Sequence, residues 1–228
     1  VALPGKELSD LIEKTSFAMA SQDVRYYLNG ILLEVSPSQI NVVATDGHRL
    51  AWSSCKIKTD FTDEKIIIPR KSALELQKLL NLYPDNVNIA FNSNQLKVFS
   101  DEYTFISKLI EGSYPDYEKV FPKGTEQKLK ANKSLVQTAL NRAAVLSNEK
   151  YRGVKFILEK DNLKICANNP SKESAEEEVL VEYSGDSFEI GFNISYVQES
   201  LSVISNNEVE FVFFGSENSC LVKNLSLI

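Results

Sequence analysis

The chain has 228 residues, of which 43% are hydrophobic and 25% charged, a composition that indicates a globular protein with one large domain or two of ordinary size. Its net charge of −6 is evenly spread, with 13 basic against 16 acidic residues over 1–122 and 12 against 15 over 123–228. Tight DNA binding through counterion release needs an excess of basic charge, so any role on DNA must be weak or topological.

An internal repeat organises the chain. Residues 29–46 overlay residues 152–169 without a gap, and their apolar positions pair at strand alternation on both sides of a turn, which predicts a β-hairpin in each copy. Apolar residues at helical spacing precede each hairpin, over 8–19 and 135–144. The repeat therefore predicts a duplicated unit of helix and strands.

Further elements follow each hairpin. Helices are predicted over 72–81 and 194–204, with Ser72 and Ser195 placed as N-caps or first-turn residues. The remaining predicted strands, in chain order, are 87–92, 95–100, 103–109, 209–214 and 220–222.

The domain boundary is predicted within Phe121–Lys128, where Pro122 and Gly124 interrupt the periodicity. We expect an α+β fold of two tandem domains, 1–122 and 123–228, each with two helices packed on antiparallel sheets.

Enzymatic signatures are sparse. His48 is the only histidine and lies beside Asp46 and Arg49, so a hydrolase-like site at these three residues is one hypothesis. The sequence has no GxSxG elbow, GxGxxG, Walker loop or HExxH, and the pair Asp46–Gly47 is typical of a turn that ends a strand. A non-enzymatic function is the favoured interpretation.

The three cysteines, Cys55, Cys166 and Cys220, are widely spaced and lack histidine companions, so we expect buried free thiols and no metal or cofactor. No run approaches the roughly 18 apolar residues of a membrane span, and the N-terminus lacks a signal-peptide pattern. A cytoplasmic protein without membrane contact is expected.

One acidic cluster stands out in a segment that resembles an edge strand. It is a solvated face, an edge-protecting strip or a partner-binding strip. Its members are Glu173, Glu176, Glu177, Glu178, Glu182, Asp186 and Glu189.

Several segments together resemble the DNA polymerase III beta subunit, or sliding clamp, of bacteria. They are QDVRYYLNG (22–30), ATDGHRLA (44–51), IIPRKSALEL (67–76), KLIEGSYPDYEKVFP (108–122), RAAVLSNEKYRGV (142–154), ANNPSKESAEEE (167–178) and EIGFNISYV (189–197). They occur in the family's order. The resemblance implies the family's second and third domains, from a subunit whose head-to-tail dimer closes a ring around duplex DNA during replication.

The resemblance also implies a groove between the two domains for short peptides of polymerases, the clamp loader and repair proteins. The matching positions are Leu28, Thr45, Gly47, His48, Arg49, Leu50, Pro115, Lys119, Val120, Tyr151, Asn193 and Tyr196. From the residues alone, Leu28, Leu50 and Val120 fit core packing equally well. Lys119 stands where the family often has arginine. The planar guanidinium of an arginine is thus replaced by the compact ammonium charge of a lysine.

Two further surfaces are implied by the resemblance. The family's DNA contacts would correspond to Gln22, Tyr26 and Tyr27, with Arg25, Arg70 and Lys71 as basic neighbours. Residues at the dimer seam would be Val145, Leu146, Glu173, Glu176 and Glu177. The first domain of the partner would then supply a basic edge for the acidic cluster.

The end of the sequence does not show the family's last strand and tail. Instead, Asn224–Ile228 (NLSLI) resembles the family's own ligand motif, QL(S/D)LF. Docking of this tail in a neighbouring groove is one hypothesis, and a remnant of the last strand is the other.

Overall fold

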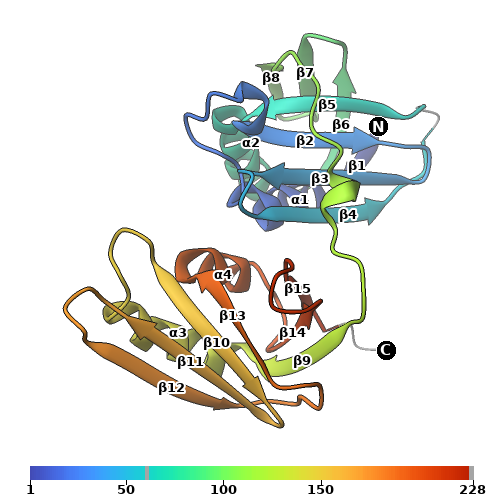
Figure 1. The fold of residues 1–228 in the computed structure, drawn as a ribbon. Coiled ribbons are helices and arrows are strands. Elements are labelled where there is room, and N and C mark those ends of the chain that lie inside the picture. The colour runs from blue at the N-terminus through green and yellow to red at the C-terminus, as the bar shows by residue number, and fades with distance from the viewer. Residues whose placement is uncertain (60–61, 226–228) are drawn as a thin grey trace. The chain divides into compact units, whose positions relative to one another are not determined.

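The computed structural model describes residues 1–59 and 62–225, and it divides into two compact units, Val1–Pro115 and Asp116–Ile228. Each unit contains two α-helices and two antiparallel sheets (Figure 1). The predicted α+β class, with two helices and antiparallel sheets in each domain, is confirmed. The units divide a few residues before the predicted limit at residue 122, which stays a prediction.

The described residues of the first unit form two α-helices, one short 3-10 helix and eight strands. In chain order they are β1 (Ala2–Pro4), α1 (Gly5–Ser16), η1 (Tyr26–Leu28), β2 (Gly30–Val35), β3 (Gln39–Thr45), β4 (Leu50–Lys56), β5 (Glu64–Pro69), α2 (Arg70–Leu82), β6 (Asn86–Phe91), β7 (Gln95–Phe99) and β8 (Thr104–Lys108).

Its two sheets have the strand orders β4-β3-β2-β5 and β1-β6-β7-β8. Alternate residues of β2 and β3, such as Ile31, Leu33 and Val42, are buried in the core with the apolar stripes of α1 and α2. The opposite face of the first sheet carries a second buried row, in which Leu32 pairs with Val43. Both faces of this sheet are therefore covered.

The second unit contains two α-helices, one short 3-10 helix and seven strands among its described residues. In chain order they are η2 (Tyr117–Val120), β9 (Gln127–Asn132), α3 (Lys133–Val145), β10 (Gly153–Glu159), β11 (Asn162–Asn168), β12 (Ser174–Leu180), β13 (Phe188–Asn193), α4 (Ile194–Ser202), β14 (Glu208–Phe213) and β15 (Leu221–Asn224).

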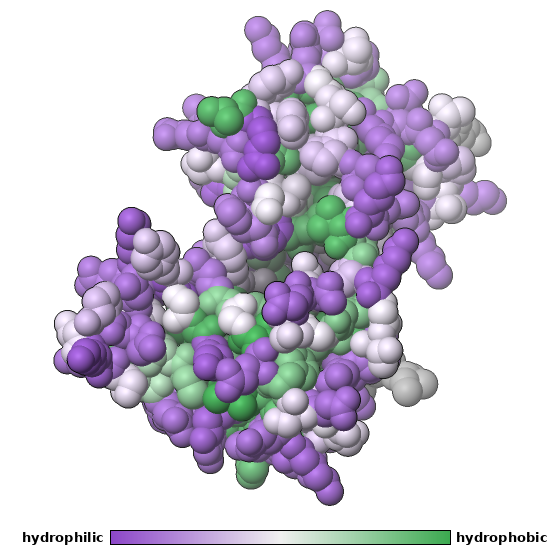
Figure 2. All heavy atoms as spheres, in the orientation of Figure 1, coloured by the Kyte–Doolittle hydropathy of each residue, from purple (hydrophilic) through white to green (hydrophobic). Residues whose placement is uncertain are grey.

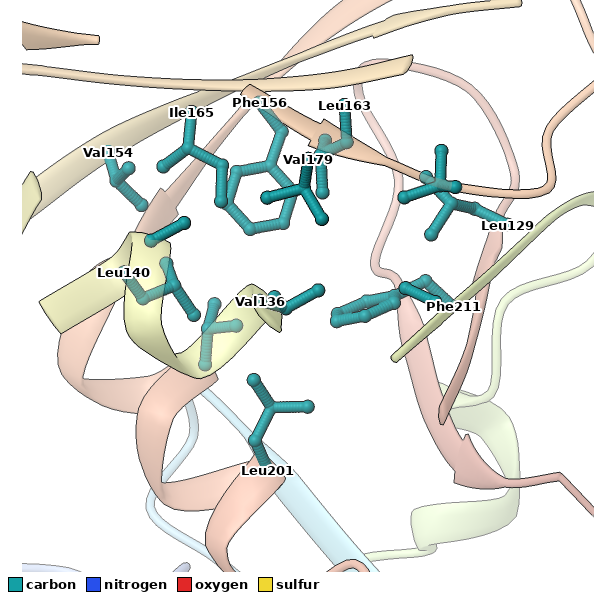
Figure 3. Close-up of a cluster of buried hydrophobic side chains, with 14 of the residues drawn as sticks. Leu129, Val136, Leu140, Val154, Phe156, Leu163, Ile165, Val179, Leu201 and Phe211 are labelled. Carbon is teal, nitrogen blue, oxygen red and sulfur yellow. The ribbon is translucent and has the colours of Figure 1, made fainter. Parts of the chain in front are cut away.

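Its sheets have the strand orders β12-β11-β10-β13 and β15-β14-β9. Figure 3 shows Val136 and Leu140 of α3 pointing into the same interior as Phe156 of β10 and Phe211 of β14. Phe156 packs edge-on against Phe211, with 6.3 Å between ring centroids. The core thus joins both sheets to the helices.

The predicted repeat is confirmed element by element. The hairpin β2–β3 corresponds to β10–β11, and Ile31, Leu33 and Ile40 of the first core occupy the positions of Val154, Phe156 and Leu163 in the second. The sheet orders also correspond, except that β8 has no counterpart among the described residues of the second unit.

Helix starts differ between the repeats. Pro4 and Pro69 precede α1 and α2, whereas Asn132 and Asn193 precede α3 and α4 and accept hydrogen bonds from backbone amides of the first turn. Asn193 accepts from the Ser195 amide at 2.9 Å. Ser195 is thus a first-turn residue, as Ser72 is in α2, and the asparagine is the cap.

The three cysteines are free thiols, and each residue is half-buried. Burial raises the pKa of the Cys220 thiol to about 12. Among the described residues, no helix is long and apolar enough to span a membrane. Hydrophilic side chains predominate on the face of each unit seen in Figure 2, with hydrophobic ones between them.

Candidate peptide site and its neighbouring surfaces

The loop Thr45–Leu50, which joins β3 to β4, is closed by its own hydrogen bonds. The Thr45 hydroxyl donates to the Arg49 carbonyl at 2.6 Å and accepts from the Gly47 amide at 3.0 Å. Gly47 has a φ of +88°, the left-handed conformation that glycine adopts without strain. The turn predicted at Asp46–Gly47 is therefore present. We call Thr45–Leu50 the recognition loop.

The Asp46 carboxylate accepts hydrogen bonds from backbone amides of this loop. Its Oδ1 accepts from the amides of His48 at 2.9 Å and Arg49 at 3.0 Å, and its Oδ2 accepts from the Arg49 Nε at 3.2 Å. The Arg49 guanidinium also donates to the Phe17 carbonyl at 2.8 Å. A carboxylate with these bonds fixes a turn, so the geometry gives no support to a catalytic Asp46–His48 pair.

Tyr114 attaches the segment before Pro115 to the recognition loop. Its hydroxyl accepts a hydrogen bond from the Thr45 amide at 3.0 Å, and burial raises the pKa of Tyr114 to about 12. Leu50 is half-buried, whereas Leu28 is only 2% exposed. Leu28 therefore offers little surface to a ligand, as expected of a core residue.

Apart from Pro115, which ends the first unit, the other predicted groove residues belong to the second unit. The Asn193 side-chain amide donates to the Tyr151 carbonyl at 3.5 Å, which brings these two residues together. Tyr196 is half-buried on α4, while Val120 and Tyr151 are 56% and 67% exposed. Lys119 pairs with Asp116 at 2.9 Å, and this bond raises the pKa of Lys119.

The residues expected near DNA lie in the segment Gln22–Leu28 and at the start of α2, both in the first unit. The Arg70 amide at the start of α2 donates to the Asn29 carbonyl at 2.9 Å, and the Arg70 guanidinium donates to the Met19 carbonyl at 3.0 Å. These bonds join the start of α2 to the residues on either side of the segment Gln22–Leu28, where Gln22 is exposed and Tyr26 is 57% exposed. Basic side chains at a helix N-terminus oppose the helix dipole, so Arg70 and the exposed Lys71 do not serve helix stability.

The residues expected at the seam lie at one edge of the second unit. β12 is the outer strand of its sheet, and Arg142 of α3 pairs with Glu177 of β12 at 3.2 Å. Val145 ends α3 with 79% of its surface exposed, and Leu146 follows as the C-cap. The apolar pair and the acidic strand thus share this edge.

Of the acidic cluster, Glu176 and Glu178 point to the face of β12 opposite Glu177, and both pair with Lys164. The hydrogen bonds of Glu173 go to Asn169, across the turn that precedes β12. Glu176, Glu177 and Glu178 therefore lie in an edge strand, as expected. Glu182 instead forms an isolated bridge with Lys130, and Glu189 lies in β13 at the opposite edge of the sheet.

The tail hypothesis lies partly outside the described residues, because 226–228 are not among them. Asn224 is the last residue of β15 and pairs with Val209, and Asn206 donates to the Leu225 carbonyl at 2.7 Å. Of the tail, only Asn224 is therefore in the strand, and both hypotheses for the segment stay open.

Sequence reasoning missed three residues that hold the recognition loop: Tyr114, Phe17 and Asp23, whose carboxylate binds Arg25. Tyr114 precedes the predicted Pro115, which is the one signal the sequence offers. Phe17 acts through its backbone carbonyl, and no side-chain pattern reveals such a contact.

Two family models match the chain. The DNA polymerase III beta subunit central domain matches residues 2–116, and the C-terminal domain of the same subunit matches residues 118–226. Together they account for nearly the whole sequence.

Beta sliding clamps are among the similar proteins. The one from Pseudomonas aeruginosa is 48% identical over 217 residues, which are 95% of this chain and 59% of that protein. The one from Escherichia coli is 42% identical over 222 residues, 97% of this chain and 61% of that protein. The chain thus spans about three fifths of the length of these relatives.

Solved structures agree. The crystal structure of a P. aeruginosa DNA polymerase sliding clamp matches with a TM-score of 0.97 at 44% identity, covering 100% of this chain and 63% of that one. A P. aeruginosa sliding clamp bound to griselimycin matches with a TM-score of 0.94 at 44% identity, covering 100% of this chain and 62% of that one.

Fold and comparisons together define a tandem pair of clamp domains. The chain belongs to the DNA polymerase III beta subunit family, and it comprises the central and C-terminal domains of that subunit.

Proposed function

We propose that this chain is part of a DNA polymerase processivity factor, a ring-forming clamp that encircles duplex DNA without catalysing a reaction. Its second task is to dock DNA polymerases, the clamp loader and repair proteins through short peptides. Such a role places the protein in the bacterial cytoplasm with the replication machinery. The match of both family models along the chain is the observation that carries the proposal.

For the peptides, we propose that two sets of residues take part, each set described within its own unit: the recognition loop and Pro115 in the first unit, and Lys119, Val120, Tyr151, Asn193 and Tyr196 in the second. The supporting geometry is local. The recognition loop is fixed by its own hydrogen bonds, so little conformational entropy is lost when a ligand binds there. Half-buried Leu50 offers an apolar contact at its end.

For DNA, we propose loose contacts from Gln22, Arg25, Tyr26, Tyr27, Arg70 and Lys71. A closed ring is retained by topology, so the acidic chain needs only a few basic groups facing phosphates. For the seam, we propose that Val145, Leu146, Glu173, Glu176 and Glu177 meet a basic partner edge.

Titration with a labelled peptide of the QL(S/D)LF type tests the docking proposal, with griselimycin as competitor. The wild-type chain should bind saturably. Leu50→Ala should lose about 1–3 kcal/mol of binding free energy because it removes a buried anchor. Leu82→Ala is the matched control, since Leu82 is a 74% exposed leucine on α2 outside the proposed site. Equal losses in both variants, or no saturable binding by the wild type, would reject the site.

The hydrolase hypothesis predicts a different result for His48→Ala. An enzyme would lose turnover of its substrate, whereas a docking site would lose peptide affinity with no reaction to measure. The bonds of Asp46 to its own loop favour the second outcome.

A further inference from the structure

The Arg25 side chain lies between two loops of the first unit. Its Nε and one terminal nitrogen bind both carboxylate oxygens of Asp23, at 3.0 and 2.8 Å. The same terminal nitrogen donates to the Asp46 carbonyl at 3.2 Å. Arg25 therefore connects the segment proposed to face DNA with the recognition loop.

The contact extends to Gly47. A Cβ built at Gly47 would lie 3.1 Å from both terminal nitrogens of Arg25, so the guanidinium packs directly against the glycine backbone. Gly47 also needs its positive φ. The Arg25 guanidinium therefore lies against the backbone at the tip of the recognition loop.

Asp23 orients the guanidinium for this contact. The Asp23 carboxylate also accepts from the Arg25 amide at 2.8 Å, and the bonds from Arg25 lower the pKa of Asp23 to about 2. Asp23 is itself held, because its amide and carbonyl both bond the Asn29 side chain, at 2.9 and 2.8 Å. The chain of contacts runs from Asn29 through Asp23 and Arg25 to Asp46.

We propose that Arg25 is a positioning residue for peptide binding: it holds the tip of the recognition loop in its binding geometry, in addition to any contact with DNA. This inference rests on the proposed peptide site. The Arg25 side chain is 46% exposed, so its ion pair contributes little to global stability. The effect of removing it should be local to the loop.

Peptide titration of Arg25→Ala, Arg25→Lys and Asp23→Asn tests the inference. Arg25→Ala should weaken peptide binding about three- to tenfold, the loss expected when one charge-assisted hydrogen bond no longer holds the loop. Arg25→Lys should recover part of the lost peptide affinity, since a lysine ammonium can still donate to the Asp46 carbonyl. It cannot bind both Asp23 oxygens at the same time as the guanidinium does. Asp23→Asn should fall between wild type and Arg25→Ala.

The control is Lys6→Ala, which removes another exposed, ion-paired cation of the same unit, bonded to Asp10 at 2.7 Å. It should leave peptide affinity unchanged. Amide hydrogen exchange supplies a second measurement, because Arg25→Ala should speed the exchange of Gly47 and His48 amides while the thermal midpoint stays the same. Unchanged exchange at these amides would overturn the inference.

The two proposals fail in different ways. Absence of peptide binding by the wild-type chain would reject the proposed site, and the exchange measurement would still decide whether Arg25 positions the loop. Normal peptide binding by Arg25→Ala would leave the peptide site standing and overturn the positioning role.

Discussion

At the scale of single residues, a buried hydroxyl contributes to stability where it has a hydrogen-bond partner. Tyr114 and Tyr103 illustrate the difference. Tyr114 accepts the Thr45 amide, whereas the buried Tyr103 hydroxyl has no hydrogen-bond partner among the described residues. Removing each hydroxyl therefore has different consequences.

Tyr114→Phe should lower the free energy of unfolding of the first unit by about 1–3 kcal/mol, because it leaves the partly buried Thr45 amide unsatisfied. Tyr103→Phe should cost nothing, since it removes a hydroxyl that already lacks a partner. Urea unfolding followed by fluorescence measures both. Equal destabilisation by the two variants would contradict the role given to Tyr114.

Tyr114 should also ionise late. Burial raises its pKa from the usual 10 to about 12, so the folded state favours the protonated phenol. The stability that this phenol contributes is complete below pH 10 and is lost as the pH rises toward 12. Titration of tyrosinate absorbance should show one late component that Tyr114→Phe lacks. A wild-type titration without that component would contradict the assignment.

At the scale of elements, the hairpins and helices were predictable because each combines a strong period with a turn or cap. The strands β1, β4, β5, β9, β12 and β13 were not predicted. β12 reads SAEEEVL, and three successive glutamates carry no strand signal of their own. It is a strand because its backbone pairs with β11 along the whole length. Tertiary pairing overrides local preference here.

The candidate site was predictable only in part. The resemblance suggested the loop residues as site residues. It did not suggest Tyr114, which bonds the loop directly, or Asp23, which acts on the loop through Arg25. Arg25 was assigned to DNA, and its bond to the Asp46 carbonyl follows from backbone placement that the sequence does not encode locally.

The two glycines at the start of the repeated hairpins should respond differently to alanine. A Cβ at Gly30 would lie 2.3 Å from the Ile68 carbonyl oxygen, whereas a Cβ at Gly153 meets nothing within 4 Å. Gly30→Ala should therefore destabilise the first unit by about 2 kcal/mol or more through overpacking. Gly153→Ala should be neutral or slightly stabilising because it reduces the freedom of the unfolded chain. Calorimetry on both variants checks this, and similar thermal midpoints would contradict it.

At the scale of the whole molecule, charge and edge strands govern association. The free edge of β12 carries Glu176 and Glu178 on one face and Glu177 on the other. Two such edges from separate copies would bring like charges together, which disfavours pairing. Pairing of two copies along this edge is therefore disfavoured.

The chain should therefore sediment mainly as a monomer at micromolar concentration. Its retention on duplex DNA should be weak and should disappear as salt is raised, because only a few phosphate contacts oppose a net charge of −6. Sedimentation velocity and a salt series on linear DNA measure the two effects. A stable dimer, or salt-resistant binding, would contradict this description of the edges and of the DNA-facing surface.

The closed recognition loop also bears on the chemical lifetime of the protein. An Asp-Gly pair ages when the glycine nitrogen attacks the aspartate side chain, forming a succinimide that opens to isoaspartate. In this loop the Gly47 amide is directed to the Thr45 hydroxyl, and the Asp46 carboxylate is held by the amides of His48 and Arg49. The folded chain should therefore accumulate isoaspartate at Asp46 more slowly than the urea-unfolded chain. Peptide mapping after matched incubations measures the two rates, and equal rates would show that the bonds give no protection. The same bonds that shape the loop for a ligand would then keep its backbone intact over the working life of the molecule.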